Sequence, residues 1–188
     1  MPYYKKLVGE ICYLSPCTPE DAENWAAWFN DLEVTIPLGD EAYTPSTLER
    51  EGEMIDEINR NLDHVFTIVD LETDQAIGRC LLFAIDQINR NGMLGIVIGA
   101  KEYWGGGYGQ EAISLLLDYA FNLLNLNSIM LGVLDFNERA IHCYDKAGFK
   151  QIGRRRQARI IGDRKCDAVL MDILAEEFES PCVTRFVG

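Results

Sequence analysis

A glycine-rich run past the middle of the chain constrains the fold more than any other feature. Residues 104–112 read Trp-Gly-Gly-Gly-Tyr-Gly-Gln-Glu-Ala, between a strand-like apolar segment (Leu94 to Gly99) and a helix-like one (Glu111 to Leu124). Glycine has no Cβ, so backbone N–H groups of such a turn can approach a ligand closely. The following helix adds unpaired N–H donors and the positive end of its dipole. The turn therefore predicts a seat for a phosphate or pyrophosphate group.

Two common phosphate-binding loops do not fit this run. A Walker loop needs Gly-Lys followed by Ser or Thr, and neither Gly107 nor Gly109 is followed by Lys. A dinucleotide-binding turn lies at the start of its domain, with an acidic residue about twenty positions later. Residues 125–130 contain no acid. A turn that only begins a helix and binds no ligand remains an alternative.

A second segment, Asn137 to Phe149, is typical of a short helix that follows a strand over Ile129–Leu134. Asn137 is a favourable N-cap residue, and Gly148 is a favourable residue just beyond a helix C-terminus. The two spaced segments together resemble the GNAT (GCN5-related) N-acetyltransferase superfamily, and within it the RimJ/RimL-like branch. The motifs cover roughly residues 90–150, and strand-like flanks extend the resemblance over most of the chain.

The resemblance implies an α/β fold of the α+β type. Its central sheet is mostly antiparallel, splayed at strands four and five and flanked by about four helices. The whole chain, 1–188, would form one N-acetyltransferase domain. The implied cofactor is acetyl-CoA, and the implied activity is acetyl transfer directly to a primary amine, without an acyl-enzyme. The amine would belong to a protein N-terminus or to a small molecule, with a polyamine such as spermidine as the alternative. A non-catalytic acyl-CoA-binding module is the alternative of another class.

The resemblance also assigns roles to individual residues. Tyr144 would be the general acid that protonates the leaving thiolate, and Asn137 would contact the pantetheine arm, with Ala140 of the same motif at the cofactor. Backbone groups of the splayed strand would hold the pantetheine and polarise the thioester; these are Val97, Ile98 and Gly99. Backbone amides of the turn would hold the pyrophosphate; these are Trp104, Gly105, Gly106, Gly107, Tyr108, Gly109 and Gln110. The family often has Gln or Arg at the position of Trp104 and Lys or Arg at that of Gly106, so phosphate binding would depend here on backbone donors.

The general base is not identified by the sequence. The proposed cofactor strand has no carboxylate, so a water chain or an acid from the N-terminal half, such as Glu33, would deprotonate the amine. His142 is expected at the surface, because it lies two residues from Tyr144 on a helix. Cys143 has no basic partner at a matching spacing, which argues against a nucleophile. The cations of 154–156 and 159 alternate between strand faces; we expect solvated side chains, with contact to an acidic substrate or a coenzyme phosphate as the alternative.

Charge and composition exclude several other classes. The net charge is −13. Residues 1–90 have 6 bases and 18 acids, giving −12, whereas residues 91–188 have 11 bases and 12 acids, giving −1. This argues against a nucleic-acid partner and suits a cationic acceptor, or simply solubility. Six scattered cysteines predict free thiols in the cytoplasm, and two histidines argue against a metal site. The sequence predicts no membrane segment or signal peptide, and leaves a homodimer open.

The expected order of elements is β-α-α-β-β-β-α-β-α-β-β. Trp25, Trp28 and Phe29 share a helical face that we expect in the core, with an acceptor pocket as the alternative. Residues 30–43 are expected as a loop, and those after Phe178 as loosely held. Strands are expected at Val8–Leu14, His64–Asp70, Ala76–Ile85, Met93–Gly99, Ile129–Leu134, Phe149–Ile161 and Cys166–Leu174. Helices are expected from Thr18-Pro19, from Thr44-Pro45 to about Asn61, over Glu111–Asn125 and from Asn137.

Overall fold

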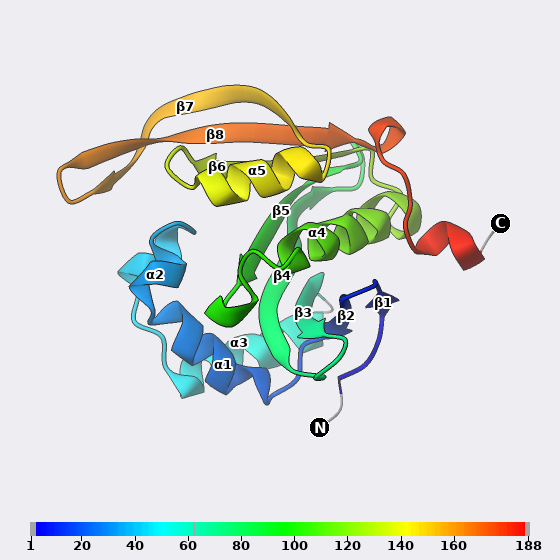
Figure 1. Ribbon diagram of the computed structural model, residues 1–188, viewed down its shortest axis with the longest axis horizontal. Coiled ribbons are helices and arrows are strands. Elements are labelled where there is room, and N and C mark those ends of the chain that lie inside the picture. Colours follow the sequence, from blue (N-terminus) through cyan, green and yellow to red (C-terminus); the bar gives the residue numbers. More distant parts are fainter. Residues whose placement is uncertain (1–2, 62, 187–188) are drawn as a thin grey trace.

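A computed structural model describes residues 3–61 and 63–186, which build a mixed sheet of eight strands with helices on both faces (Figure 1). The strands are β1 (Leu7–Val8), β2 (Cys12–Pro16), β3 (Val65–Asp70), β4 (Ala76–Asp86), β5 (Asn91–Ile98), β6 (Ser128–Leu134), β7 (Lys150–Ile161) and β8 (Arg164–Leu174). The α-helices are α1 (Asp21–Phe29), α2 (Leu32–Thr35), α3 (Leu48–Asn61), α4 (Tyr108–Asp118) and α5 (Glu138–Lys146). A π-helical turn (Tyr119–Leu123) continues α4.

The sheet is antiparallel except at one pair of strands. Its order is β1-β2-β3-β4-β5-β6-β8-β7, and the parallel neighbours are β5 and β6. These two pair only over Asn91–Met93 and Ser128–Met130, after which they diverge. The expected mostly antiparallel sheet with a splay is therefore confirmed. The expected fourth strand is β5, because the N-terminal strand is in fact a hairpin and adds one to the count.

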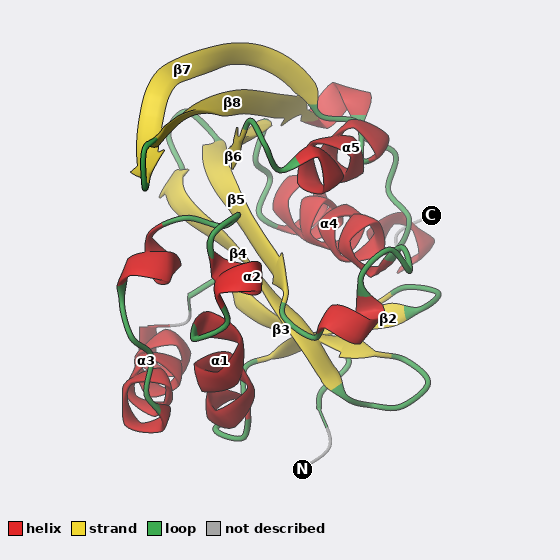
Figure 2. Ribbon diagram, turned by 60° about the vertical axis from the view of Figure 1, so that its left-hand side comes forward, coloured by secondary structure: helices red, strands yellow, loops and turns green. Residues whose placement is uncertain are grey.

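Two helical layers cover the sheet (Figure 2). The helices α1 and α3 pack together on one face, and α4 and α5 lie on the other. On the α4 side the core includes Leu115, Leu116 and Ile129, all at most 1% exposed. On the α1 side a separate cluster gathers around Trp25 and Ile55, both 0% exposed, and it includes Val97 of β5. Strand β5 is therefore shared between both cores.

Two local expectations were wrong because distant side chains decide the outcome. The single strand expected over Val8–Leu14 is the hairpin β1–β2, whose turn is held by the carboxylate of Glu111, about a hundred residues away. The loop expected over 30–43 contains α2 and a 3₁₀ turn over Asp40–Tyr43. Asp31 caps α2, since its side chain accepts the N–H of Glu33 at 2.9 Å.

The expectation that residues after Phe178 are loosely held was also wrong. Cys182 and Val183 are buried against the main core. Their N–H groups both donate to the Asp118 carboxylate at 2.8 Å. Asp118 is itself fully buried, so these hydrogen bonds satisfy a carboxylate that would otherwise be costly to bury. The C-terminal segment thus closes over the end of α4.

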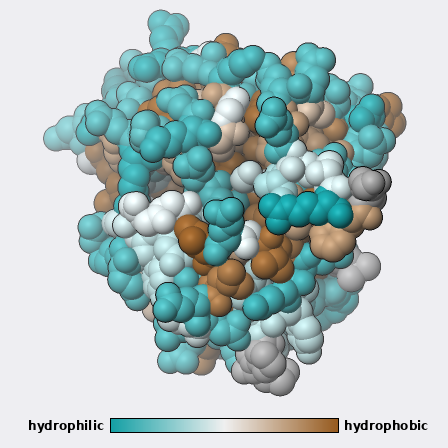
Figure 3. All heavy atoms as spheres, turned by 45° about the vertical axis from the view of Figure 1, so that its right-hand side comes forward, coloured by the Kyte–Doolittle hydropathy of each residue, from teal (hydrophilic) through white to brown (hydrophobic). Residues whose placement is uncertain are grey.

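Charged and polar side chains cover most of the face in Figure 3, with apolar side chains gathered between them. Among the described helices, none has the length and apolar character needed to cross a membrane. The described residues likewise contain no group of three or more His, Cys, Asp or Glu side chains placed to hold a metal ion.

Candidate active site

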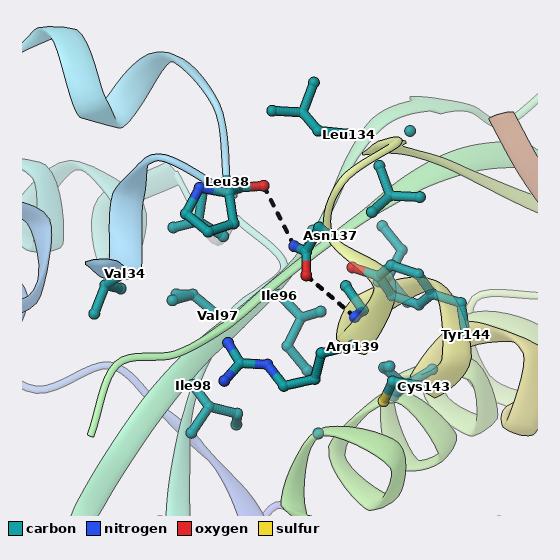
Figure 4. A pocket seen from close by; sticks show the side chains of 18 of the residues that line it. Val34, Leu38, Ile96, Val97, Ile98, Leu134, Asn137, Arg139, Cys143 and Tyr144 are labelled. Atoms are coloured by element: carbon teal, nitrogen blue, oxygen red, sulfur yellow. Dashed lines mark hydrogen bonds between the residues drawn. The ribbon is translucent and has the colours of Figure 1, made fainter. Parts of the chain in front are cut away.

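A cleft of about 830 Å³ opens where β5 and β6 diverge. Residues from β5, the glycine-rich turn and α5 line one end, and residues from the α1–α2 region, β4 and β7 line the other. Figure 4 shows Val97 and Ile98 of β5 facing the same space as Asn137 and Tyr144 from α5 and its cap. The predicted site residues all line this cleft except Gly99 and Gly106. The structure therefore brings together two motifs that lie about thirty residues apart.

The glycine-rich turn brings unpaired N–H groups to the lining of the cleft. Gly105 and Gly107 have φ angles of +80° and +89°, which side chains other than glycine rarely adopt. The first helical hydrogen bond of α4 joins the Glu111 N–H to the Gly107 carbonyl at 3.1 Å. The N–H groups of residues 108–110 consequently have no helical acceptor. Those of Gly105 and Gly107 also form no backbone hydrogen bond within the described residues.

Trp104 contributes through its side chain and not through its main-chain donor. Its N–H donates to the Lys101 carbonyl at 3.1 Å, so this group is already used. Its indole Nε1 donates to the Ile98 carbonyl at 2.7 Å. The guanidinium of Arg139 lies over the indole ring, 3.7 Å from its centroid. Gly106 is exposed at the tip of the turn, and its N–H is 3.5 Å from the Tyr103 carbonyl. The candidate donor set is thus narrower than the sequence predicted.

The start of α4 is anchored on its outer side. The hydroxyl of Tyr108 donates to the Asp70 carboxylate at 2.8 Å. This hydrogen bond raises the pKa of Tyr108 to about 12. The Tyr108 ring also meets the Tyr103 ring edge-on, with 5.1 Å between centroids. The N–H donors at the mouth of α4 therefore sit on a braced turn.

Tyr144 lies on the inner side of α5 and is 9% exposed. Its side chain lines the cleft, and its hydroxyl forms no hydrogen bond to other described groups. Burial raises the pKa of the Tyr144 phenol, and the neighbouring Cys143 acts in the same direction. The phenol consequently holds its proton across the neutral range.

Asn137 joins α5 to the α1–α2 region. Its Oδ1 accepts the N–H of Ala140 at 3.2 Å, which caps α5 as expected. Its Nδ2 donates to the carbonyl of Pro37 at 3.4 Å (Figure 4). Ala140 lines the cleft beside it. Asn137 thus links the start of α5 to the segment that follows α2.

Gly99 does not line the cleft, because it is buried under Trp28. A Cβ at Gly99 would lie 2.1 Å from the indole of Trp28. Trp25 is 0% exposed, which confirms its place in the core, whereas Phe29 is buried and also lines the cleft. The aromatic side chains of α1 therefore pack mainly in the core, and Phe29 also forms part of the cleft wall.

Other residues singled out in the sequence lie at the edge of the site. Glu33 pairs with Lys101 at 2.9 Å, has a 65% exposed side chain and does not line the main cleft. His142 is exposed at the rim, as expected. Cys143 lines the cleft, but burial raises the pKa of its thiol, with Lys146 and Arg139 acting against the shift. A neutral thiol agrees with the expectation that Cys143 is not a nucleophile.

Sequence reasoning missed Arg79 of β4, which lines the far end of the cleft. The signal was a lone cation within the otherwise apolar strand Ala76–Ile85. Arg155 and Arg159 of β7 line the same end, whereas Arg154 pairs with Asp167 at 3.3 Å outside it. The strand cations are therefore split between solvent and cleft.

Comparison with known proteins agrees with this architecture. The acetyltransferase (GNAT) domain family matches residues 12–150. An uncharacterised N-acetyltransferase, p20, of Bacillus licheniformis is 30% identical over 161 residues, covering 85% of this chain and 90% of that protein. The spermidine N(1)-acetyltransferase of Vibrio cholerae is 33% identical over 121 residues, covering 64% of this chain and 69% of that protein.

Solved structures give the same answer. The crystal structure of spermidine N-acetyltransferase from Vibrio cholerae, in complex with CoA and spermine, superposes with a TM-score of 0.77 at 25% identity. The match covers 90% of this chain and 98% of that one. The chain with this splayed sheet and braced glycine turn belongs to the GNAT family and is an acetyl-CoA-dependent acyltransferase.

Proposed function

We propose that this protein transfers an acetyl group directly from acetyl-CoA to a primary amine, with Tyr144 as the general acid. The main observation in support is that free N–H donors at the N-terminus of α4 and the unpaired hydroxyl of Tyr144 line the same cleft. The donors suit a pyrophosphate, since no side chain at Gly105 or Gly107 stands in front of them. The thioester of acetyl-CoA supplies the activated acetyl group.

Tyr144 would deliver the proton that the departing thiolate needs. A phenol and a thiol differ in ordinary pKa by only about 1.5 units. A closed site that raises the pKa of the phenol by desolvation raises that of the departing thiol in the same direction, so the transfer is feasible. Burial keeps the phenol protonated, because ionisation in a poorly solvated position is costly. A positioned general acid typically contributes about 10²- to 10⁴-fold in rate.

Main-chain groups of β5 would stabilise the developing oxyanion. Past Met93 the edge of β5 that faces β6 has lost its pairing partner, so its N–H groups can point into the cleft. One well-placed N–H donor lowers such a barrier by about 3 kcal/mol. The Ile98 carbonyl on this strand is engaged by Trp104, which fixes the strand next to the proposed thioester position.

The test is Tyr144→Phe, with Tyr4→Phe as its matched control because Tyr4 is 65% exposed. We expect kcat to fall by about 10²-fold or more, while the Kd for acetyl-CoA, measured by calorimetry, stays within about twofold because the N–H donors are untouched. The Tyr4→Phe variant should match the unaltered protein. Full turnover in Tyr144→Phe would remove Tyr144 from the role.

The acceptor amine is a separate part of the proposal. A protein N-terminus or a small amine both fit direct transfer. A polyamine is the alternative that the acidic first half of the chain suits, with a net charge of −12 from 6 bases and 18 acids over residues 1–90, and the similar protein of Vibrio cholerae is named a spermidine acetyltransferase. Assaying labelled acetyl-CoA with spermidine and a set of N-terminal peptides separates these acceptors.

A further inference from the structure

The end of the cleft away from α4 carries an excess of guanidinium groups. Arg79, Arg155 and Arg159 line it, whereas its carboxylates are Asp40 and Glu41. Asp40 is 93% exposed and pairs with Arg159 at 3.1 Å, so it lies at the rim. Glu41 is half-buried, so this end has three guanidinium groups against two carboxylates, a net charge of +1, although the first half of the chain is strongly acidic overall.

Arg79 is the innermost of these cations. It lies directly opposite Val97 in the β4–β5 pairing, so both side chains point to the same face of the sheet. Its guanidinium carbon lies 4.5 Å from the ring centroids of both Trp25 and Phe29. These aromatic contacts hold the planar group in one orientation beside the strand proposed to hold the thioester.

The polar atoms of Arg79 lack acceptors. Its Nε is buried without a hydrogen-bond partner, and no carboxylate among the described residues lies within 4.0 Å of it. One terminal nitrogen contacts only the Met54 sulfur, at 3.7 Å. Burial lowers the pKa of Arg79, and the charges of Glu41 and then Glu51 act against the shift. Glu51 is itself buried, with its Oε2 unpaired, but it forms no hydrogen bond with Arg79. A confined guanidinium without a hydrogen-bonded carboxylate is costly, and an anionic ligand that accepts from its free N–H groups would reduce that cost.

The pairing of β7 with β8 adds the other two cations. Arg155 lies opposite Ala168 and Arg159 opposite Cys166, with an irregular stretch between them. Because residues 166 and 168 share a face of β8, Arg155 and Arg159 share a face of β7, and Ala168 on that face lines the cleft. The terminal nitrogen of Arg159 that pairs with Asp40 at 3.1 Å is buried, but the two atoms form no hydrogen bond in good geometry.

We infer that the acceptor is a small primary amine carrying a carboxylate, of the amino-acid kind, and that Arg79 binds this carboxylate. The inference rests on the proposed acetyl transfer. Arginine forms two parallel hydrogen bonds with a carboxylate. The apolar part of such an acceptor would lie against Phe29, Val34 and Leu38, which also line the cleft. A polyamine has no group for Arg79 and would bring cations toward cations.

The carboxylate does not enter the reaction. The neutral amine attacks the acetyl carbonyl carbon, the N–C bond forms and the C–S bond breaks. The thiolate takes a proton from Tyr144, the nitrogen releases one proton to water, and water returns one proton to the Tyr144 phenolate. Arg79 therefore determines acceptor specificity, and its replacement should raise the KM for the acceptor.

The experiment compares matched acceptors on the whole protein. The panel contains the twenty L-amino acids, short ω-amino acids, the carboxamide of each, and spermidine. We expect at least one carboxylate to exceed its own amide in kcat/KM by about tenfold or more, the value of one charge-assisted hydrogen-bond pair. In Arg79→Met this preference should fall to near parity through the acceptor KM. The exposed Arg156, which does not line the cleft, gives the control Arg156→Met, which should keep the preference.

A second measurement tests the inference when an acceptor binds but is acetylated slowly, or when Arg79→Met does not fold. The unfolding temperature of the unaltered protein in the presence of CoA should rise when a carboxylate acceptor is added, and should not rise when the matching amide is added. The inference is overturned if amides or spermidine have a kcat/KM at least as high as that of every carboxylate. That result would leave the acetyltransferase proposal unaffected. A panel in which no carboxylate is preferred by either assay also overturns the inference. Absence of acetyl transfer to every amine, with no acetyl-CoA binding, would instead contradict the proposed function itself.

Discussion

The indole Nε1 of Trp104 donates a hydrogen bond to the main-chain carbonyl of Ile98, with 2.7 Å between the two atoms. Trp104 begins the glycine turn, and Ile98 ends β5, so this bond joins the proposed pyrophosphate seat to the proposed thioester strand. Arg139 of α5 covers the same indole ring at 3.7 Å. Three elements of the site therefore meet at one side chain.

Replacing Trp104 with Phe should weaken cofactor binding more than turnover. Phe keeps a ring under Arg139 but loses the donor to Ile98, a net loss of about 1 kcal/mol. We expect the Kd for acetyl-CoA to rise about fivefold, with kcat changed by less than about twofold, because Trp104 does not touch the transferred proton. Calorimetry measures the Kd. An unchanged Kd in a folded Trp104→Phe protein would contradict the bracing role.

The packing of Gly99 under Trp28 predicts a loss of stability on adding one carbon. In Gly99→Ala the new Cβ would meet Trp28 at 2.1 Å, and overpacking of this kind costs about 1–3 kcal/mol. The free energy of unfolding in urea measures the effect. Gly153→Ala is the matched control, since no heavy atom lies within 4 Å of its added Cβ, and it should stay within about 0.5 kcal/mol. Equal stability of the two variants would sink the prediction.

The parts of the site that the sequence predicts correctly depend on local chemistry. Asn137 caps α5 with its own side chain, and Gly148 takes a φ of +96° just past that helix. Gly105 and Gly107 take the positive φ angles that the turn needs. Each of these outcomes is set within a few residues, so the residue types alone indicate them.

The parts that the sequence does not predict depend on contacts between distant segments. Glu111 lies about a hundred positions from the hairpin turn that it holds, and Asp118 lies 64 positions from Cys182. Arg79 joins the cleft because β4 pairs with β5 and because α1 brings Trp25 over the same face. Periodicity places Arg79 on a strand, but only the packing of another layer decides which face of that strand meets the cleft.

Removing the charge of Glu111 should destabilise the hairpin β1–β2. Its carboxylate accepts the N–H groups of Glu10, Ile11 and Cys12 at 2.6, 2.9 and 2.7 Å. Gln can offer only one oxygen, so Glu111→Gln leaves at least one N–H facing another donor, a loss of about 2 kcal/mol. Urea unfolding measures this loss.

The matched control for that change is Glu49→Gln, an exposed acid in the first turn of α3. It removes a similar favourable interaction with a helix dipole, about 0.5 kcal/mol, but no hairpin contact. If both variants lose the same free energy, the helix dipole accounts for Glu111 and the hairpin contact contributes nothing measurable.

The contact between Asp70 and Tyr108 predicts how the braced turn responds to acid. Burial raises the pKa of Asp70, but hydrogen bonds from Thr73 and then Tyr108 outweigh it and leave the pKa below its ordinary value. A lowered pKa adds stability that is complete above the unfolded value of about 3.9 and is lost as the pH falls through the folded value. Asp70→Asn should therefore be less stable than the unaltered protein at pH 6, and the gap should narrow below about pH 4.

Urea unfolding between pH 6 and pH 2.5 measures that gap directly. Asp56→Asn serves as the control, because Asp56 is exposed on α3 and the substitution of an exposed residue should change the free energy of unfolding by no more than about 0.5 kcal/mol. Tyr108→Phe removes one of the donors to Asp70 and should lose part of the same pH dependence. A gap for Asp70→Asn that stays constant down to pH 2.5 would show that the Asp70 carboxylate gains nothing from its partners on folding.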